Sequence, residues 1–354
     1  TGVPYLFVNQ VGGQDELVFD GSSYAVDHDG TEHQLLGDFV TGTAMVAFDP
    51  ATHCFESDAQ AELTEGWHAE YRAAVLALGD YVNKNKFPGV VLGMSGGIDS
   101  ALTAAMAVDA LGPDRVWCVM MPSKYTSSDS LEDAKACAKA LGVKYDSINI
   151  APGVDAMGEM LADQFANTTP DTTEENIQSR LRAVTLMALS NKFGHMVVTT
   201  GNKSEMAVGY ATLYGDMCGG YNALKDFYKT EVFELAKWRN TMVPRGALGP
   251  AGEVIPERII TKPPSAELRE DQRDDDSLPP YDVLDDILRG LVDEEEPIEA
   301  ILARGHDRAV VKRIEHLLYI AEYKRRQAPP GVKVGGKNFG RDRRYPITNR
   351  FRDD

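Results

Sequence analysis

The sequence predicts an α/β protein with a doubly wound parallel sheet, preceded by a short β-rich segment. From Val90 onward, short apolar runs alternate with amphipathic helical segments. The first of these runs opens into a Ser-Gly-Gly-x-Asp-Ser turn at residues 95–100, whereas residues 1–50 carry short apolar runs separated by Gly, Asn and Asp. Strands that alternate with helices give parallel sheets, and closely spaced strands with tight turns give antiparallel ones.

Composition indicates a cytosolic protein with a large core. The chain has 354 residues, 43% of them hydrophobic, which allows one large domain and an appendage. No apolar run approaches the ~18 residues of a membrane span, and the start lacks the pattern of a signal peptide. The four cysteines share no metal-ligand or disulfide spacing, so we expect reduced thiols. A net charge of −18 argues against nucleic-acid partners.

The N-terminal segment reads as part of a larger sheet. Its expected strands lie at residues 5–8, 17–19, 24–26 and 44–48. These strands are too few to enclose a core of their own. A polar connector is expected over residues 49–58, and the apolar spacing of residues 62–84 predicts a helix.

The following region supplies the parallel sheet. Gly112 and Gly142 are expected to end two helices, and a Thr172-x-x-Glu175 capping box to begin a third. Ser95, Ser123-Lys124 and Thr200 each follow a strand, so we expect them to converge where such sheets bind ligands. The expected elements are strands at 90–93, 116–121, 143–150 and 196–200, and helices at 101–111, 128–141 and 172–194.

The turn at residues 95–100 has the features of a pyrophosphate cradle. Gly96 and Gly97 let backbone N–H groups approach a ligand at a helix N-terminus, and the two serines add hydroxyl donors. Asp99 is an acid where phosphate is expected, which makes sense if a divalent cation lies between them. An ordinary Gly-rich strand-to-helix turn is the alternative. The expected ATP-binding residues here are Gly93, Met94, Ser95, Gly96, Gly97, Ile98, Asp99 and Ser100.

The motifs together resemble those of NAD synthetases of the glutamine-dependent type, in the ATP pyrophosphatase superfamily. The resemblance covers residues 65–354 and implies an adenine nucleotide α-hydrolase-like fold. Residues 8–15 also resemble the closing strands of a nitrilase-like amidase. The motifs, in order, are Ser95 to Ser100, Asn176-x-x-x-Arg180-x-Arg182, Thr200 to Glu205, Gly209-Tyr210 with Tyr214 to Asp216, Lys262 to Leu268, Asp276 to Tyr281, Lys324 to Arg326 and Lys337 to Pro346.

This resemblance implies three units: an amidase remnant with its connector at 1–58, a synthetase domain at 59–330 and a basic C-terminal strap at 331–354. Nitrilase-like amidases use a Glu, a Lys and a nucleophilic Cys, and no stretch that matches them occurs here. Cys54 lies in the expected connector without an oxyanion-binding turn. We therefore expect the 354-residue chain to use ammonia, and glutamine to be the source of that ammonia in a full-length enzyme.

The activity implied is ATP-dependent amidation of deamido-NAD to NAD through an acyl adenylate, with release of AMP and diphosphate. The resemblance assigns catalysis to Asp99, Glu205 and Lys229, and Mg²⁺ to Asp99 and Glu205. Thr200, Lys229 and Ser265 are expected near the ATP phosphates. Deamido-NAD is assigned to Asn176, Arg180, Glu205, Tyr323 and Lys324. Each of three assigned residues also has an alternative interpretation without a function. Glu205 could be an acid favoured at a helix N-terminus, Lys229 a solvated surface lysine, and Lys324 a cation favoured at a helix C-terminus.

Asn176 and Arg180 lie four residues apart and so share a helix face, while Arg182 points elsewhere and is as readily an ion-pair residue. Two loops leave alternatives open. Residues 333–352 carry seven cations against Asp342, as a nucleic-acid tail would, but Phe339, Tyr345 and Phe351 favour a strap that packs on the chain's own acidic surface. Residues 267–276 are either a mobile lid or a solvated loop.

Four other functions remain open. A GMP synthetase or a tRNA-thiolating enzyme would share the loop, but neither fits the Lys-Pro-Pro-Ser and Asn-x-x-x-Arg motifs. A nucleotide-binding module without turnover would have no use for a pair of metal carboxylates. A scaffold is the fourth, and we expect assembly as a homo-oligomer, at least a dimer, that houses the sites.

Overall fold

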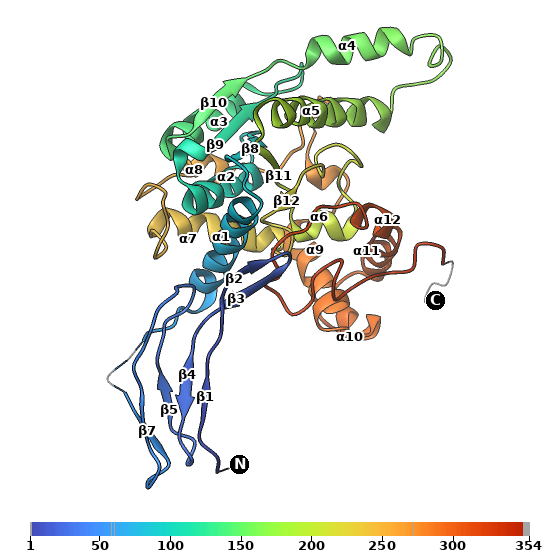
Figure 1. Cartoon of the computed structure of the whole chain (residues 1–354). Helices are drawn as coiled ribbons and strands as arrows, with labels where there is room; N and C mark the ends of the chain where they lie inside the picture. Colours follow the sequence, from blue (N-terminus) through green and yellow to red (C-terminus); the bar gives the residue numbers. More distant parts are fainter. Residues whose placement is uncertain (1, 58, 60, 271, 350–354) are drawn as a thin grey trace.

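A five-stranded parallel sheet lies at the centre of the computed structural model, which describes residues 2–57, 59, 61–270 and 272–349 (Figure 1). Its strand order is β10-β9-β8-β11-β12. The chain runs outward from β8 through β9 to β10 and then returns to the other side of β8, so the order reverses between β8 and β11. The predicted doubly wound sheet is confirmed. The strands are β8 (Val90–Gly93), β9 (Val116–Met120), β10 (Lys144–Ser147), β11 (Met196–Thr199) and β12 (Tyr221–Asn222).

Helices cover both faces because strand side chains alternate in direction. Val90 and Leu92 pack into one core with the helices of the first face, whereas Val91 points into a second core with Leu186 of α5. The first face holds α1 (Gly66–Lys84), α2 (Ile98–Leu111), α3 (Ser128–Leu141), α7 (Lys229–Thr241) and α8 (Glu257–Thr261). The second holds α4 (Ala151–Met160) and α5 (Thr172–Phe193).

The N-terminal strands form an arm that projects from the body (Figure 1). Three of them make an antiparallel sheet in the order β1-β4-β5, and the others form two hairpins. The expected connector at 49–58 is wrong over residues 54–56, because these pair with the strand that precedes them. Asp58 lies outside the described residues. The strands are β1 (Tyr5–Phe7), β2 (Val11–Gln14), β3 (Leu17–Asp20), β4 (Tyr24–Val26), β5 (Glu32–Gln34), β6 (Ala47–Asp49) and β7 (Cys54–Glu56).

Several predicted boundaries need correction. The capping box of α5 is formed by Asp171 and Glu174, one residue before the predicted pair: Asp171 accepts from the N–H of Thr173 over 2.7 Å, and Glu174 accepts from that of Asp171 over 2.8 Å. The strand expected at 143–150 is limited to β10, and α4 was not predicted. The helix expected from residue 62 begins at Gly66.

A helical cluster with its own core follows the sheet. The helix expected to end at Lys324-Arg325-Arg326 is interrupted at Ala321, so Lys324 and Arg325 belong to a separate short helix and Arg326 follows it directly. The cluster contains α6 (Lys203–Val208), α9 (Tyr281–Leu288), α10 (Ile298–Ala303), α11 (Arg308–Ile320), α12 (Glu322–Arg325) and the π-helical turn η3 (Arg289–Asp293). Two 3₁₀ turns lie elsewhere, η1 (Pro113–Arg115) and η2 (Asp274–Asp276). None of the described helices combines the length and apolar character that a membrane crossing needs.

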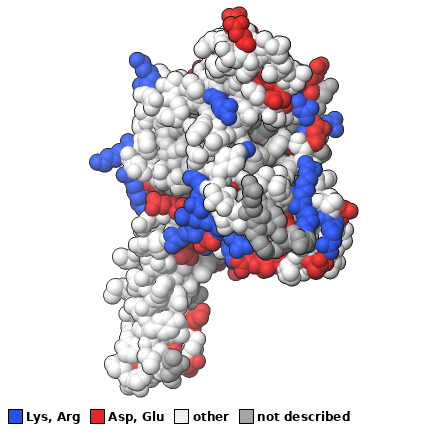
Figure 2. Space-filling view, turned by 90° about the vertical axis from the view of Figure 1, so that its right-hand side faces the viewer, with Lys and Arg blue, Asp and Glu red and all other residues white. Residues whose placement is uncertain are grey.

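The C-terminal segment runs back over this cluster. Phe339 and Tyr345 are buried in its core, and Lys337 and Arg343 both pair with Glu295. The carbonyl of Lys337 also accepts from the buried ammonium of Lys203 over 2.9 Å. Figure 2 shows cations interleaved with carboxylates over the body, whereas the face of the arm in this view carries a few carboxylates and no cation. Arg350, Phe351 and Arg352 lie outside the described residues.

Candidate active site

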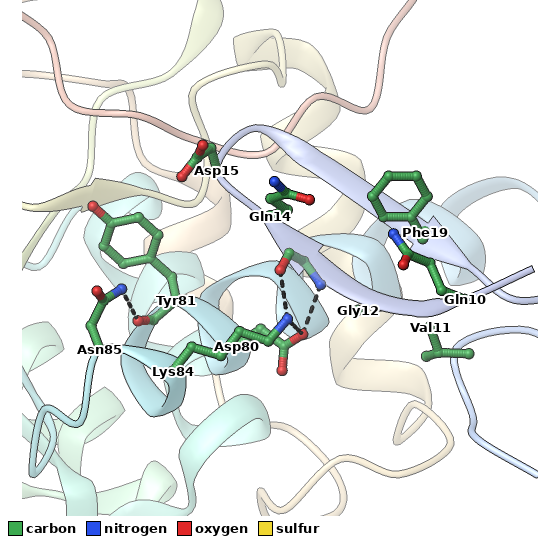
Figure 3. Close-up of a pocket in the computed structure, with 11 residues that line it drawn as sticks. Gln10, Val11, Gly12, Gln14, Asp15, Phe19, Asp80, Tyr81, Lys84 and Asn85 are labelled. Atoms are coloured by element: carbon green, nitrogen blue, oxygen red, sulfur yellow. Dashed lines mark hydrogen bonds and ion pairs between the residues drawn. The ribbon is translucent and has the colours of Figure 1, made fainter.

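Of two cavities lined by described residues, the smaller has polar side chains that already bond to its own backbone. It encloses about 360 Å³ between the β2–β3 hairpin and α1 (Figure 3). Asp80 accepts from the N–H of Gly13 over 2.7 Å, and Lys84 donates to the carbonyl of Gly13 over 2.8 Å. Asp80 and Lys84 also pair with each other at 2.9 Å. These contacts fasten the arm to the body.

The larger cavity, about 770 Å³, lies beyond the carboxyl ends of β8, β9 and β11. It is therefore at the switch point of the sheet, where open α/β sheets bind ligands. The predicted Ser123-Lys124 are not among its lining residues, and Thr126 and Ser127 stand there instead. The sequence-predicted residues that line it are Gly93, Met94, Ser95, Gly97, Ile98, Asp99, Ser100, Asn176, Thr200, Glu205, Lys229, Ser265 and Lys324. Those that do not are Gly96, Arg180 and Tyr323.

The turn between β8 and α2 is held in shape by Ser95 and Ser100. Their hydroxyls lie 3.1 Å apart, the N–H of Gly97 donates to the Ser95 hydroxyl, and Ser100 donates to the carbonyl of Gly97. Gly96 is required for another reason than the predicted approach to a ligand. Its φ is +79°, and a Cβ there would lie 2.4 Å from the carbonyl oxygen of Ser130 in α3. The turn is thus wedged between the cavity and α3.

Three charged side chains meet beside this turn. The ammonium of Lys229 pairs with the carboxylate of Asp99 and lies 3.4 Å from Oε1 of Glu205. Asn202 caps α6 and donates from its side-chain amide to Oδ1 of Asp99 over 2.9 Å. The Lys229 side chain is 3% exposed, while those of Asp99 and Glu205 keep 17% and 18%, so the carboxylates face the cavity. The cluster thereby joins three parts of the fold. Asp99 follows β8, Glu205 follows β11, and Lys229 begins α7.

This arrangement raises the pKa of both Glu205 and Lys229, for different reasons. Burial raises the pKa of Glu205 to about 8, and the nearby charge of Lys229 only partly offsets that rise. Burial alone would lower the pKa of Lys229, but the carboxylates of Asp99 and Glu205 raise it overall. Lys229 therefore remains a cation deep in the cavity wall.

Asp274 is a fourth charged residue that sequence reasoning missed. It belongs to the loop at 262–280 and is 5% exposed. The hydroxyls of Tyr281 and Tyr210 donate to its two carboxylate oxygens over 2.8 and 3.3 Å. The Lys229 ammonium lies 5.2 Å from the centre of the Tyr281 ring. The acidic run at 267–276 gave no reason to single out this one carboxylate.

The same loop is tied to the other side of the cavity. Glu267 accepts from the hydroxyls of Ser127 and Ser130 over 2.8 Å each. Gln178 of α5 donates to the carbonyl of Leu268 over 2.8 Å. The loop thus bridges α3 and α5 across the cavity mouth, rather than standing free in solvent.

On α5 the cavity face differs from the predicted one. Arg182 lines the cavity and donates to the carbonyl of Met121 over 3.1 Å, whereas Arg180 is exposed and donates to the carbonyl of Leu213. The lining residues follow mixed steps of three and four, so the face that holds Asn176 continues at Ser179 rather than at Arg180. Arg182 thus lies where Arg180 was expected.

Lys324 and Tyr323 are neighbours on α12 that point about 100° apart, and only Lys324 faces inward. Lys324 lines the cavity and donates to the carbonyls of Gly209 and Ala211 over 2.7 Å each. Tyr323 points outward and is 45% exposed. Lys324 thus braces the backbone of residues 209–211 against the cavity.

The donor set suits Mg²⁺ better than a closed metal cage. No cluster of three or more His, Cys, Asp or Glu with metal-binding geometry occurs among the described residues. Mg²⁺ commonly takes one or two carboxylates and completes its shell with phosphate oxygens and water. Asp99 and Glu205 offer such a pair at the cavity surface.

Comparison with known proteins agrees with this geometry. Residues 70–328 match the NAD synthase family. The chain is 53% identical to the glutamine-dependent NAD(+) synthetase of Rhodobacter capsulatus over 100% of its own length and 64% of the relative's. It therefore spans less than two thirds of that relative.

Solved structures give the same assignment. Glutamine-dependent NAD+ synthetase from Acinetobacter baumannii, in complex with ADP, is 45% identical with a TM-score of 0.69, covering 98% of this chain and 62% of that one. NH3-dependent NAD synthetase from Campylobacter jejuni, in complex with nitrate, is 27% identical with a TM-score of 0.57, covering 72% of this chain and 94% of that one. Together with the charged cluster beside the Ser95–Ser100 turn, these similarities show that the chain belongs to the NAD synthase family.

Proposed function

We propose that the chain catalyses the ATP-dependent amidation of deamido-NAD to NAD, with ammonia as the immediate nitrogen donor. The observation that carries this proposal is the meeting of Asp99, Lys229 and Glu205 beside the Ser95–Ser100 turn in the 770 Å³ cavity. A turn at a helix N-terminus suits phosphates, and a buried cation beside it suits neutralisation of the charge that develops on their oxygens.

The reaction has two balanced steps. A carboxylate oxygen of the nicotinate group attacks the α-phosphorus of ATP, and the bond to the β-phosphate oxygen breaks to release diphosphate. Ammonia then attacks the carbonyl carbon of the acyl adenylate, loses a proton, and displaces AMP. Both steps depend on alignment and on neutralisation of oxygen charge, so no covalent nucleophile is needed from the protein.

We assign the phosphate end of the cavity to the turn at 95–100 together with Thr200, Lys229 and Ser265. Lys229 holds a positive charge where oxygen charge develops on the phosphates. Asp99 and Glu205 would hold Mg²⁺, which supplies further neutralisation of the phosphate oxygens. Asn202 orients Asp99 through its amide, over 2.9 Å.

The dinucleotide is assigned to the opposite wall. Asn176 and Lys324 line the cavity there, and we add Arg182 to this wall on its position. Arg180 shares its helix face with Val184, which is 63% exposed. We propose that this face packs in a homo-oligomer, at least a dimer, so that Arg180 would serve the cavity of a second copy.

The four cysteines are unpaired, as in a reducing compartment, and we propose the cytosol as the site of the reaction. The similarity to NAD synthetases does not favour a GMP synthetase or a binding module without turnover. The retained cation and its two carboxylates favour turnover over binding alone.

Product analysis tests the proposal. The purified chain, with ATP, Mg²⁺, ammonium and deamido-NAD, is expected to form NAD, AMP and diphosphate in equal amounts. Xanthosine monophosphate in place of deamido-NAD should give no AMP. Release of ADP and phosphate, or AMP release that depends on xanthosine monophosphate, would overturn the proposal, and ATP binding without AMP release would identify a binding module.

A further inference from the structure

Helix α9 presents two side chains, one turn apart, toward the first residue of α7. Tyr281 places its ring beside the Lys229 ammonium, as described above. Asp285 lies four residues later, so it shares that face of α9. Its Oδ2 accepts from the backbone N–H of Thr230 over 2.9 Å, and its side chain is 1% exposed. The start of α7 is therefore held from α9.

Ser204 completes the junction from α6. Its hydroxyl donates to Oδ1 of Asp285 over 2.5 Å and accepts from the backbone N–H of Lys229 over 2.8 Å. Ser204 is fully buried and immediately precedes Glu205 in the chain. One hydroxyl thus connects the backbone of Lys229 to the helix that carries Glu205.

The groups of this junction are mutually satisfied. Asp285 accepts from both the Ser204 hydroxyl and the Thr230 backbone, so its charge lies against the first N–H groups of α7, where a helix favours an anion. Loss of one member would leave buried donors without acceptors and free the first turn of α7 to move. The residue in that turn that reaches the site is Lys229.

We propose that Asp285, acting through Ser204 and the first turn of α7, is a positioning residue that sets the Lys229 ammonium against Asp99 and Glu205. This inference rests on the proposed function, because it assigns Asp285 a role only in a reaction that uses Lys229. Asp285 itself touches no reacting group. Its effect on the rate is transmitted by the placement of Lys229.

A double-mutant cycle separates positioning from a merely structural role. Asp285→Asn is expected to lower kcat by about 10- to 100-fold, the range for a lost hydrogen bond to a charged group, with KM for deamido-NAD within about twofold. Combined with Lys229→Ala, it should lower kcat by less than about threefold beyond Lys229→Ala alone. Asp282→Asn, an exposed position on the same helix, is the matched control and should retain wild-type rates.

Each outcome has one meaning. Equal rates for Asp285→Asn and Asp282→Asn, or losses that multiply in the double variant, would overturn the inference. Should Asp285→Asn fail to fold by circular dichroism, Ser204→Ala carries the same cycle, since it removes the acceptor for the Lys229 N–H. Absence of AMP release by the wild-type chain would instead refute the proposed function. The wild-type measurement therefore tests that function independently of the variants.

Discussion

Asn202 donates from its side-chain amide to Oδ1 of Asp99 over 2.9 Å, and its own side-chain oxygen accepts from the backbone N–H of Glu205 over 3.0 Å. A single buried amide thus ties the Asp99 carboxylate to the backbone of the helix that carries Glu205. Because an amide resists movement when both its ends are bonded, the pair is preorganised before any ligand arrives.

Asp99→Asn should lower turnover by at least about 10²-fold, since loss of one charge-stabilising contact costs ~2.7–4 kcal/mol of barrier. The fold should persist, because the new amide keeps the size of the carboxylate. Steady-state kinetics over a range of Mg²⁺ concentrations, with the thermal midpoint as a control, measures both. Wild-type rate and Mg²⁺ dependence would remove Asp99 from the site.

Lys229→Ala should weaken ATP binding by about one to two decades, the scale of one lost hydrogen bond to a charged group. Deamido-NAD affinity should change little. Calorimetric titration of each substrate gives the two values. Lys237→Ala, an exposed lysine on the same helix, is the control, and an equal loss there would deny Lys229 a special role.

Arg182→Ala should weaken deamido-NAD binding by a similar one to two decades, because its guanidinium lines the cavity. Arg180→Ala should have this effect only at concentrations where the chain self-associates. Titrations above and below the association midpoint, found by analytical ultracentrifugation, compare the two. An Arg180→Ala effect in the monomer would contradict the oligomer proposal.

Nitrogen-donor use tests the expected lack of amidase groups. The purified 354-residue chain should make NAD with ammonium and not with glutamine, because no Glu, Lys and Cys of the nitrilase-like pattern occur in it. Coupled assays with each donor, in ammonia-free glutamine, measure this. Glutamine-driven synthesis that survives Cys54→Ser would point to a nucleophile elsewhere in the chain, and synthesis abolished by that change would point to Cys54.

Acid should loosen the link between the arm and α1. Burial opposes ionisation of Asp38, but hydrogen bonds from Thr64 and Arg72 lower its pKa overall. A carboxyl that binds its proton more weakly when folded adds stability above its unfolded pKa, near 3.8, and this stability is lost as pH falls below that value. The protection of residues 66–84 from hydrogen exchange, corrected for the intrinsic rate at each pH, should therefore fall below about pH 4.

Asp38→Asn should show this lower protection already at neutral pH, since breaking a buried pair costs ~3–5 kcal/mol. The protection of this variant should then change little on acidification. Asp114→Asn, at an exposed turn, is the control. Identical acid responses of wild type and Asp38→Asn would show that another group governs the junction.

The sequence was informative where periodicity reports burial. The strands at 90–93 and 116–121 are continuous apolar runs, and they form buried strands of the parallel sheet as predicted, the second ending at Met120. α4 has no buried residue, and β12 has only two residues, so neither leaves a pattern to detect. Cys54-Phe55-Glu56 became a strand through pairing with β6, a tertiary contact that its polar neighbours concealed.

The candidate site divides in the same way. Asp99, Glu205 and Lys229 stood out because they belong to recognisable motifs, and the structure brings them within contact. Arg182 and Asp274 did not, because their positions depend on which stripe of α5 faces the cavity and on how one loop closes. Those are properties of the assembled fold, and the roles of all five residues remain predictions.

Lys203 lies two residues before Glu205, and its side chain is held partly by the C-terminal segment. Its ammonium pairs with Asp226 and Asp293, each at 3.0 Å, and donates to the carbonyl of Lys337, 134 residues later. A chain cut between residues 293 and 337 would therefore keep both ion pairs of this buried lysine but lose one of its acceptors. The start of the helix that carries Glu205 thus depends on a contact made more than 130 residues further along the chain.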